Sequence, residues 1–249
     1  MLSPEEKQRY DRQMLISGIG EAGQEKLKKA RVVIAGTGGL GSPIAFYLTA
    51  AGIGTLRLID NDKVELSNLN RQILHWDKDV GKAKTASAYD KLTKLNKNVT
   101  LETIHMTIDE SNVSQLTEGF DVIVDAMDNL STRFLLNKAA VKHKVPFIHG
   151  AVSGLEGRAM TVLPGKSACL KCVYHTLPAE HKFPVLGTTP AVIGAIEATE
   201  VIKYIIGLGT LLTDRLLIYD GLNMNFTELK IVRNINCEHC GDAVTGHNT

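Results

Sequence analysis

Three glycines with the spacing of a nucleotide-binding turn stand near the beginning of the sequence. Gly36, Gly38 and Gly41 follow the apolar run RVVIA and precede a stretch with helical periodicity. At such a strand-to-helix turn, backbone amides and the positive end of the helix dipole can face a phosphate. Asp60 ends the next apolar run, where a carboxylate can accept hydrogen bonds from ribose hydroxyls. The pattern indicates a nucleotide site, with NAD and another nucleotide as equal alternatives and a simple tight turn as a third.

The charged residues after this aspartate favour a nucleoside triphosphate over a dinucleotide. Arg71, Lys82 and Lys84 bring cations that a triphosphate needs and a dinucleotide pyrophosphate does not. Further along, Asp125 and Asp128 follow another strand-like run, at the edge where open α/β sheets bind ligands. A carboxylate there can hold Mg²⁺ against phosphates. Taken singly, each of these residues can also be a solvated surface charge or a helix cap.

The four cysteines form two Cys-x-x-Cys pairs, Cys169 with Cys172 and Cys237 with Cys240. In a chain without secretory features, such pairs favour reduced thiolates and metal over disulfides. Together they offer four thiolates for tetrahedral Zn²⁺ with no open coordination position, so we expect a structural zinc site. Thiols that never meet and a redox-active dithiol are the alternatives. His239, inside the second pair, is expected to be a bystander.

These residues need a scaffold that gathers strand ends, and the hydrophobic pattern predicts one. Apolar, β-branched runs alternate with helical periodicity up to residue 150, which is typical of βαβ units. The predicted strands are 31–36, 55–60, 99–105, 121–126 and 145–150, and the predicted helices are 39–51, 82–95, 109–117 and 131–143. The predicted antiparallel strands are 157–164, 215–221 and 225–232, with a helix across 190–206. The fold class is therefore α/β: a Rossmann-like, mostly parallel, doubly wound sheet extended by antiparallel strands.

Length and composition predict a single domain over residues 1–249, because 44% hydrophobic residues suffice for one substantial core. Within it we expect a nucleotide-binding half at about 1–150, and C-terminal strands with the zinc site at about 150–241. A functional crossover loop is expected at 173–189 and a flexible tail at 242–249. The formal charge of +1 gives no bulk field that recruits nucleic acid or a membrane surface. The polar N-terminus and the lack of a long apolar run predict a cytoplasmic protein without a membrane segment.

Several motifs together resemble a known family. They are GTGGLGS, DxDxVxxSNLNRQ, GKAK, DAMDN and the two cysteine pairs, and they extend from about residue 4 to about residue 241. In this order they resemble the bacterial E1-like activating enzymes, which include the molybdopterin-synthase adenylyltransferase and the sulfur-carrier adenylyltransferase of the thiamine pathway. The resemblance implies that ATP adenylates the C-terminal glycine of a small ubiquitin-like sulfur carrier ending in Gly-Gly. Magnesium and zinc are the implied metals, and a homodimer is the implied assembly.

The resemblance also assigns roles to individual residues. It implies that Gly39 lies against the nucleotide, that Asp60 holds the ribose and that Asp128 binds magnesium. Arg71 and Lys84 are implied to contact ATP. The remaining implied contacts of the nucleotide are Asp62, Ser67, Asn68, Asn70, Gln72 and Asn129. Arg12, in RYDRQ, resembles the arginine that this family supplies from the opposite subunit of a homodimer.

One feature of the family is missing from the sequence. Many members carry a cysteine in the crossover stretch, used for a thioester or acyl disulfide, but residues 173–189 contain none, and the corresponding position is near Glu180. We therefore expect the reaction to stop at the acyl adenylate, with a sulfur donor or second protein as the later nucleophile. The alternative functions are an NAD-dependent Rossmann oxidoreductase and a noncatalytic carrier-binding module. Nothing after Asp128 offers an obvious hydride-transfer site.

Overall fold

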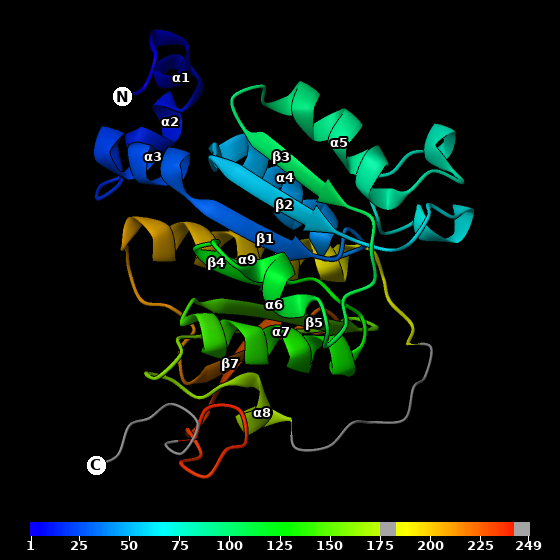
Figure 1. Ribbon diagram of the computed structural model, residues 1–249, viewed down its shortest axis with the longest axis vertical. Coiled ribbons are helices and arrows are strands. Elements are labelled where there is room, and N and C mark those ends of the chain that lie inside the picture. Colours follow the sequence, from blue (N-terminus) through cyan, green and yellow to red (C-terminus); the bar gives the residue numbers. More distant parts are fainter. Residues whose placement is uncertain (175–182, 242–249) are drawn as a thin grey trace.

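The computed structural model describes residues 1–174 and 183–241, with one eight-stranded sheet and helices on both of its faces (Figure 1). The strands are β1 (Arg31–Ala35), β2 (Thr55–Ile59), β3 (Thr100–Ile104), β4 (Val122–Asp125), β5 (Phe147–Ser153), β6 (Glu156–Val162), β7 (Arg215–Asp220) and β8 (Asn225–Lys230). Their order is β3-β2-β1-β4-β5-β6-β7-β8. The first five strands in this order pair in parallel, and β6, β7 and β8 continue the sheet in antiparallel pairing. The predicted mixed α/β sheet is confirmed.

Helices cover the two faces of the sheet in separate groups. The α-helices are α1 (Pro4–Arg9), α2 (Asp11–Met14), α3 (Gly20–Lys29), α4 (Gly41–Ala51), α5 (Lys84–Leu95), α6 (Val113–Thr117), α7 (Leu130–His143), α8 (Leu170–Val173) and α9 (Thr188–Ile206), and the 3₁₀ helices are η1 (Leu66–Asn68) and η2 (Asp77–Asp79). α3, α4, α5 and α9 share a hydrophobic core that includes Leu48 and Leu56. α6, α7 and α8 pack on the other face around Ile123 and Phe147. Each face of the sheet therefore has its own core.

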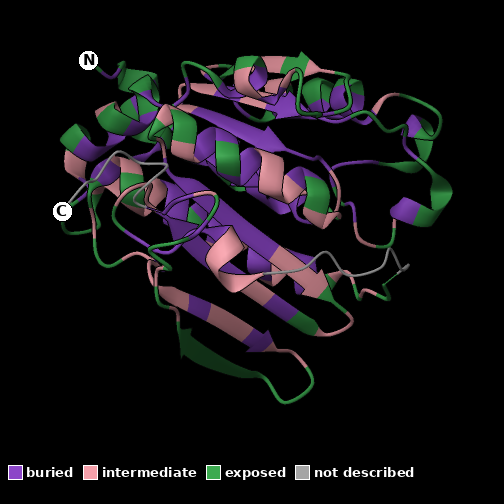
Figure 2. Cartoon of the chain, turned by 60° about the horizontal axis from the view of Figure 1, so that its bottom comes forward, coloured by how far each residue is buried: buried purple, intermediate pink, exposed green. Residues whose placement is uncertain are grey.

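The burial of each strand follows its place in the sheet (Figure 2). β1 has a neighbour on each side and helices on both faces, and Val32, Val33 and Ile34 have no exposed surface. A strand covered on both faces must be apolar throughout, and for this reason apolar runs predicted the parallel strands. β8 lies at the edge of the sheet, and all six of its residues are exposed.

The turn between β1 and α4 requires glycine at two positions. Gly36 has a φ of 96°, in the left-handed region that favours glycine. A Cβ on Gly41 would lie 2.0 Å from the carbonyl oxygen of Gly36, so any side chain there would push α4 away from β1. The first turn of α4 therefore packs directly against the end of β1, and its N-terminus lies at the carboxyl edge of the parallel strands.

The structure departs from the sequence prediction at some boundaries. The helix expected over 109–117 occupies only Val113–Thr117, because the side chains of Asp109 and Asn112 hydrogen-bond the backbone before it. α9 begins at Thr188, inside the loop expected over 173–189. Residues 175–182 of that loop, which include Glu180, and the tail 242–249 lie outside the described residues.

The N-terminal helices α1, α2 and α3 have no counterpart in the prediction. α3 contains a single large apolar residue, Leu27, so its sequence lacks the repeated apolar spacing that predicted the other helices. Within residues 1–174 and 183–241, no helix has the length and apolar character needed to cross a membrane.

Candidate functional site

A cavity of about 1280 Å³ opens at the carboxyl ends of the parallel strands. β1 lies between β2 and β4, so the strand order reverses there, and open α/β sheets bind ligands at such a point. Most residues predicted to bind a nucleotide line this cavity: Gly36, Gly38, Gly39, Asp60, Asp62, Ser67, Asn70, Arg71, Gln72, Lys84, Asp128 and Asn129. Small-molecule pockets have volumes of about 300–1,000 Å³. This cavity therefore leaves room for a second group beside a nucleotide.

Asp60 ties the glycine-rich turn to the end of β2. Its Oδ2 accepts hydrogen bonds from the Thr37 backbone N–H at 2.8 Å and from the Thr37 hydroxyl at 2.9 Å. Its Oδ1 accepts from the Asp62 backbone N–H at 2.8 Å. The carboxylate is therefore oriented before any ligand binds, with its edge at the cavity.

Two cations lie along one wall of the cavity. Lys84 is the first residue of α5, its side chain is only 7% exposed, and its Nζ lies 2.7 Å from the Asp62 carboxylate. Arg71 donates through Nη1 to the Ser67 carbonyl oxygen at 2.8 Å and to the Asn70 side-chain oxygen at 3.0 Å. Both cations are thus held by protein acceptors in advance, which limits the reorganisation that an incoming anion requires.

Asp128 lines the cavity, whereas Asp125 is buried behind it. Asp125 has no exposed surface and accepts from His149 Nδ1 at 2.6 Å and from the Met127 N–H at 3.0 Å. Arg133 Nε lies 3.4 Å from the same carboxylate. Burial lowers the pKa of His149 although Asp125 opposes the shift. Of the two carboxylates at this strand end, Asp125 is already paired inside the protein, and Asp128 is the one that faces the cavity.

Three residues of the predicted set lie outside the cavity. Asn68 Oδ1 accepts from the Glu65 N–H at 3.2 Å, so this side chain stabilises η1. Gly41 serves the packing of α4 against β1. Arg12 is exposed on α2 and does not line the cavity of its own chain. Asn129 does line the cavity, but it also caps the N-terminus of α7.

The outer part of the cavity was not predicted from the sequence. Its wall comprises Ala151, Val152, Ser153, Glu156, Arg158, Tyr174, Phe183, Pro184 and Val185. Arg158 donates through Nε and Nη2 to Glu156 at 2.9 and 2.7 Å. The Gly154 N–H donates to the Pro184 carbonyl oxygen at 2.6 Å, which joins the chain before α9 to the β5–β6 turn. The alternation of β6 indicated that Glu156 and Arg158 share a face, but not which strand would lie beside them.

The four cysteines, although far apart in sequence, meet in one cluster. Their Sγ atoms lie within 4.8 Å of one another. The distance is 3.7 Å between Cys169 and Cys237 and 3.6 Å between Cys172 and Cys240. All four are free thiols. The alternative in which the two pairs never meet is therefore wrong, and the cluster has the donor set of a metal site.

Asn137 of α7 holds the two cysteine pairs together, a role that sequence reasoning missed. Its Oδ1 accepts from the Leu170 N–H at 3.0 Å, next to the first pair, and its Nδ2 donates to His239 Nδ1 at 2.9 Å, inside the second. His239 thus lies beside the cluster and hydrogen-bonds to Asn137. The group of side chains that could hold a metal ion consists of the four cysteines and does not include His239.

Comparison with known proteins identifies a family, related sequences and a similar structure. The sequence profile of the ThiF family matches residues 10–240. The chain is 40% identical to a protein of Haloferax volcanii named SAMP-activating enzyme E1, covering 94% of this chain and 88% of that one. It is 38% identical to the sulfur carrier protein adenylyltransferase of Thermus thermophilus, covering 97% and 93% of the two chains. The fold is similar to the crystal structure of E. coli MccB with ATP, with a TM-score of 0.85 and 27% identity over 93% of this chain and 74% of that one.

Proposed function

Since the chain belongs to the ThiF family, as its motifs predicted, we propose that it is an ATP-dependent adenylyltransferase for a small ubiquitin-like sulfur carrier protein. Its products are a carrier acyl adenylate and pyrophosphate. The observation that carries this proposal is one cavity in which Asp60, Arg71, Lys84 and Asp128 surround a glycine-rich turn. The names of two relatives, an activating enzyme E1 and a sulfur carrier protein adenylyltransferase, support the same function.

ATP would lie along the inner part of the cavity. Asp60 is placed to accept from ribose hydroxyls, and Arg71 and Lys84 are placed to bind phosphate oxygens. Asp128, a carboxylate on the same wall, suits Mg²⁺, which prefers oxygen ligands. When bound, Mg²⁺ neutralises phosphate charge. The side chains of this wall thus fit a triphosphate better than a dinucleotide.

The reaction needs charge neutralisation more than proton transfer. A carboxylate oxygen of the terminal glycine forms a bond to the α-phosphorus, and the bond from that phosphorus to the bridging oxygen breaks, releasing pyrophosphate. The nucleophile is already ionised at neutral pH, so no general base is required. Both reactants are anions, and Arg71 and Lys84, held in place by protein acceptors, lower the resulting repulsion.

The outer part of the cavity would receive the C-terminal tail of the carrier. The Gly154–Pro184 hydrogen bond holds the chain before α9 against the β5–β6 turn, and these two segments form the outer wall. Arg158 and Glu156 lie in the same part of the wall. A tail entering there would reach the inner part with its carboxylate first.

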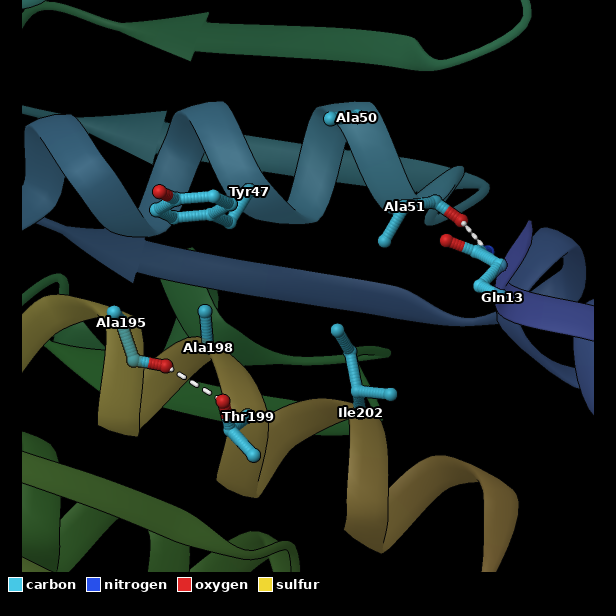
Figure 3. Close-up of a pocket in the computed structure, with 8 residues that line it drawn as sticks. All are labelled: Gln13, Tyr47, Ala50, Ala51, Ala195, Ala198, Thr199 and Ile202. Atoms are coloured by element: carbon cyan, nitrogen blue, oxygen red, sulfur yellow. Dashed lines mark hydrogen bonds between the residues drawn. The ribbon is translucent and has the colours of Figure 1, made fainter. Parts of the chain in front are cut away.

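A homodimer would complete the site. An apolar groove of about 320 Å³ lies between α4 and α9 beside α2, lined by Gln13, Tyr47, Ala50, Ala51, Ala195, Ala198, Thr199 and Ile202 (Figure 3). The Tyr47 side chain is 58% exposed. We propose that a second copy of this chain covers the groove. The neighbouring α2 carries Arg12, which does not reach the cavity of its own chain and would supply a cation to the partner's.

Zinc in the cysteine cluster would have a structural role. A tetrahedral site with Zn–S bonds of about 2.3 Å has S–S edges of about 3.8 Å. The distances of 3.7 Å for Cys169–Cys237 and 3.6 Å for Cys172–Cys240 fit this size. Four thiolates leave no position for a substrate, and reduced thiols suit the cytoplasm. The sequence offers no fifth cysteine for a thioester, so the acyl adenylate would be passed directly to a sulfur donor or second protein.

Pyrophosphate exchange into ATP tests the proposed function. The protein is expected to catalyse exchange with a ubiquitin-like carrier ending in Gly-Gly, and not with the same carrier lacking its last glycine. Mg·ATP is expected to raise the melting temperature because it binds only the folded protein, whereas NAD is not. Stabilisation by NAD alone would support an oxidoreductase instead, and carrier binding without exchange would support a noncatalytic module.

A further inference from the structure

A continuous chain of hydrogen bonds runs through the protein behind the glycine-rich turn. Lys91 of α5 donates to Ser87 Oγ at 2.7 Å, and this hydroxyl lies 2.9 Å from His75 Nδ1. On the other side of the ring, His75 Nε2 lies 2.9 Å from the Thr37 carbonyl oxygen. Thr37 in turn donates to Asp60 through its N–H and its hydroxyl. None of these five residues is more than 8% exposed, so the chain is sheltered from water.

The groups at the two ends of this hydrogen-bond chain determine which group donates and which accepts at each step. The Lys91 ammonium can only donate, and it contacts Asp79, the Ser87 carbonyl oxygen and Ser87 Oγ, which accounts for its three protons. A backbone carbonyl can only accept, so His75 carries its proton on Nε2 and donates it to Thr37. His75 Nδ1 then accepts from the Ser87 hydroxyl. A neutral imidazole therefore satisfies both hydrogen bonds of the ring.

The last link fixes a peptide plane at the cavity. The peptide between Thr37 and Gly38 is trans, so its carbonyl and the Gly38 N–H point in opposite directions. With the carbonyl held by His75, the N–H is directed away from His75, and Gly38 lines the cavity. We propose that His75 is a positioning residue for ATP, which turns the Gly38 amide toward the bound nucleotide. This role rests on the proposed function of the cavity.

Protonation of His75 would disrupt the chain at Ser87, the link that orients the ring. An imidazolium would donate from both nitrogens, and the Ser87 hydroxyl would lose its acceptor. The charged groups that face the ring are Lys91 and Lys84 of α5, whose charges together with burial lower the pKa of His75, and Asp60 after β2, which with the Thr37 carbonyl opposes them. The ring is therefore neutral at physiological pH and titrates only under more acidic conditions.

The test compares two His75 variants by equilibrium binding of Mg·ATP without carrier, below the melting temperature. Leucine at this position cannot hold the Thr37 carbonyl, and we expect His75→Leu to weaken binding about tenfold, the equivalent of one hydrogen bond. Glutamine offers a donor and an acceptor, and His75→Gln is expected to stay within about threefold of wild type. His143 is a matched control, because its Nε2 also contacts a serine hydroxyl and carbonyl, of Ser114, outside the cavity. His143→Leu is expected to leave binding unchanged.

A pH profile separates positioning from a merely structural role. Wild-type affinity for Mg·ATP is expected to fall on the acid side more steeply than that of His75→Gln, because only the wild type carries a ring whose protonation removes the Ser87 link that orients it. Equal profiles for these two proteins, or undiminished binding by folded His75→Leu, would overturn the positioning role. Should His75→Leu not fold, Ser87→Ala serves instead, since it removes the hydroxyl that orients the ring. Unchanged affinity of Ser87→Ala for Mg·ATP would likewise overturn the positioning role. Failure of the wild type to bind Mg·ATP would overturn the proposed function itself, and the role of His75 with it.

Discussion

Replacing Glu197 by glutamine is expected to change how the stability of the protein depends on pH. Glu197 lies on α9, its side chain has no exposed surface, and neither carboxyl oxygen has a hydrogen-bond partner among the described residues. A Cβ on Gly150 would lie 2.2 Å from its Oε2, so α9 and β5 are in close contact here. Burial and the nearby charge of Asp125 raise the pKa of Glu197 well above its ordinary value. Folding therefore keeps this acid protonated.

The sign of the pH effect follows from this shift. Between the unfolded and the folded pKa, the folded protein binds more protons at Glu197 than the unfolded chain does. The stability due to this group is fully present below about pH 4.3 and falls as pH rises, by about 1.4 kcal/mol per unit until the folded pKa is passed. One proton changes stability by at most about 1.4 kcal/mol per pH unit, so raising the pH from 5.5 to 7.5 removes at most about 2.7 kcal/mol at this group. Glutamine does not titrate, so the variant lacks this loss.

Urea unfolding at these two pH values measures the effect. The free energy of unfolding of Glu197→Gln, relative to wild type, is expected to increase from pH 5.5 to 7.5, with an upper limit of about 2.7 kcal/mol for one proton over two pH units. The exposed Glu118 provides the control, and Glu118→Gln is expected to show no such change. The unpaired amide of glutamine can change the free energy of unfolding by the same amount at both pH values. Only the difference between the two pH values therefore tests the titration of Glu197. The same pH dependence in wild type and in Glu197→Gln would refute the reasoning.

Four further predictions concern the proposed reaction. Arg71→Ala and Asp128→Ala are each expected to lower pyrophosphate exchange by a factor of about 10²–10³ at unchanged melting temperature, because Arg71 would offset phosphate charge directly and Asp128 would hold the Mg²⁺ that offsets it; full activity would remove that residue from the site. Arg12→Ala is expected to be inactive alone but to recover part of the exchange when mixed with Arg71→Ala, since one site of each heterodimer lacks both defects. No recovery after confirmed subunit exchange would contradict a site shared across a dimer. Metal analysis is expected to find one zinc per chain, and Cys169→Ser to lower the melting temperature at unchanged Mg·ATP affinity; fully folded metal-free protein would argue against this. With carrier, ATP and Mg²⁺, a bound adenylate is expected without any carrier–enzyme conjugate on nonreducing gels, and a thiol-sensitive conjugate mapped to a cysteine would contradict direct transfer.

Part of the nucleotide side of the cavity was predictable because its residues follow closely after strands. Gly36 follows β1, Asp60 follows β2 and Asp128 comes shortly after β4. Parallel strands share one carboxyl edge, so alternation of strands and helices is enough to bring these residues together. Asp125 and Asp128 could not be told apart from the residues alone, because two carboxylates near a strand end give the same local signal. Only the register of β5, which places His149 opposite Asp125, decides that one of them is buried.

The His75 chain and the outer wall could not be predicted, because they depend on contacts between distant segments. His75 and Ser87 are polar residues of common types that belong to none of the motifs, and their alignment with Thr37 requires α5 to pack behind the turn after β1. Arg158 reaches the cavity because β6 pairs with β5 so that Ala151 lies opposite Arg158. A shift of one residue in that register would turn Arg158 to the other face, and no local pattern fixes it.

The change from parallel to antiparallel pairing at β5 would allow the proposed nucleotide and protein tail to share one cavity. β4 ends at Asp125, whereas β5 continues for seven residues to Ser153 because β6 pairs along its whole length. Another parallel strand would require a crossover of a dozen or more residues, which would take the chain away from this edge. The turn at Gly154, with a φ of 60°, instead returns the chain at once and places Arg158 on the cavity wall. We therefore expect the glycine carboxylate and the α-phosphate to meet where the parallel half of the sheet adjoins the antiparallel half.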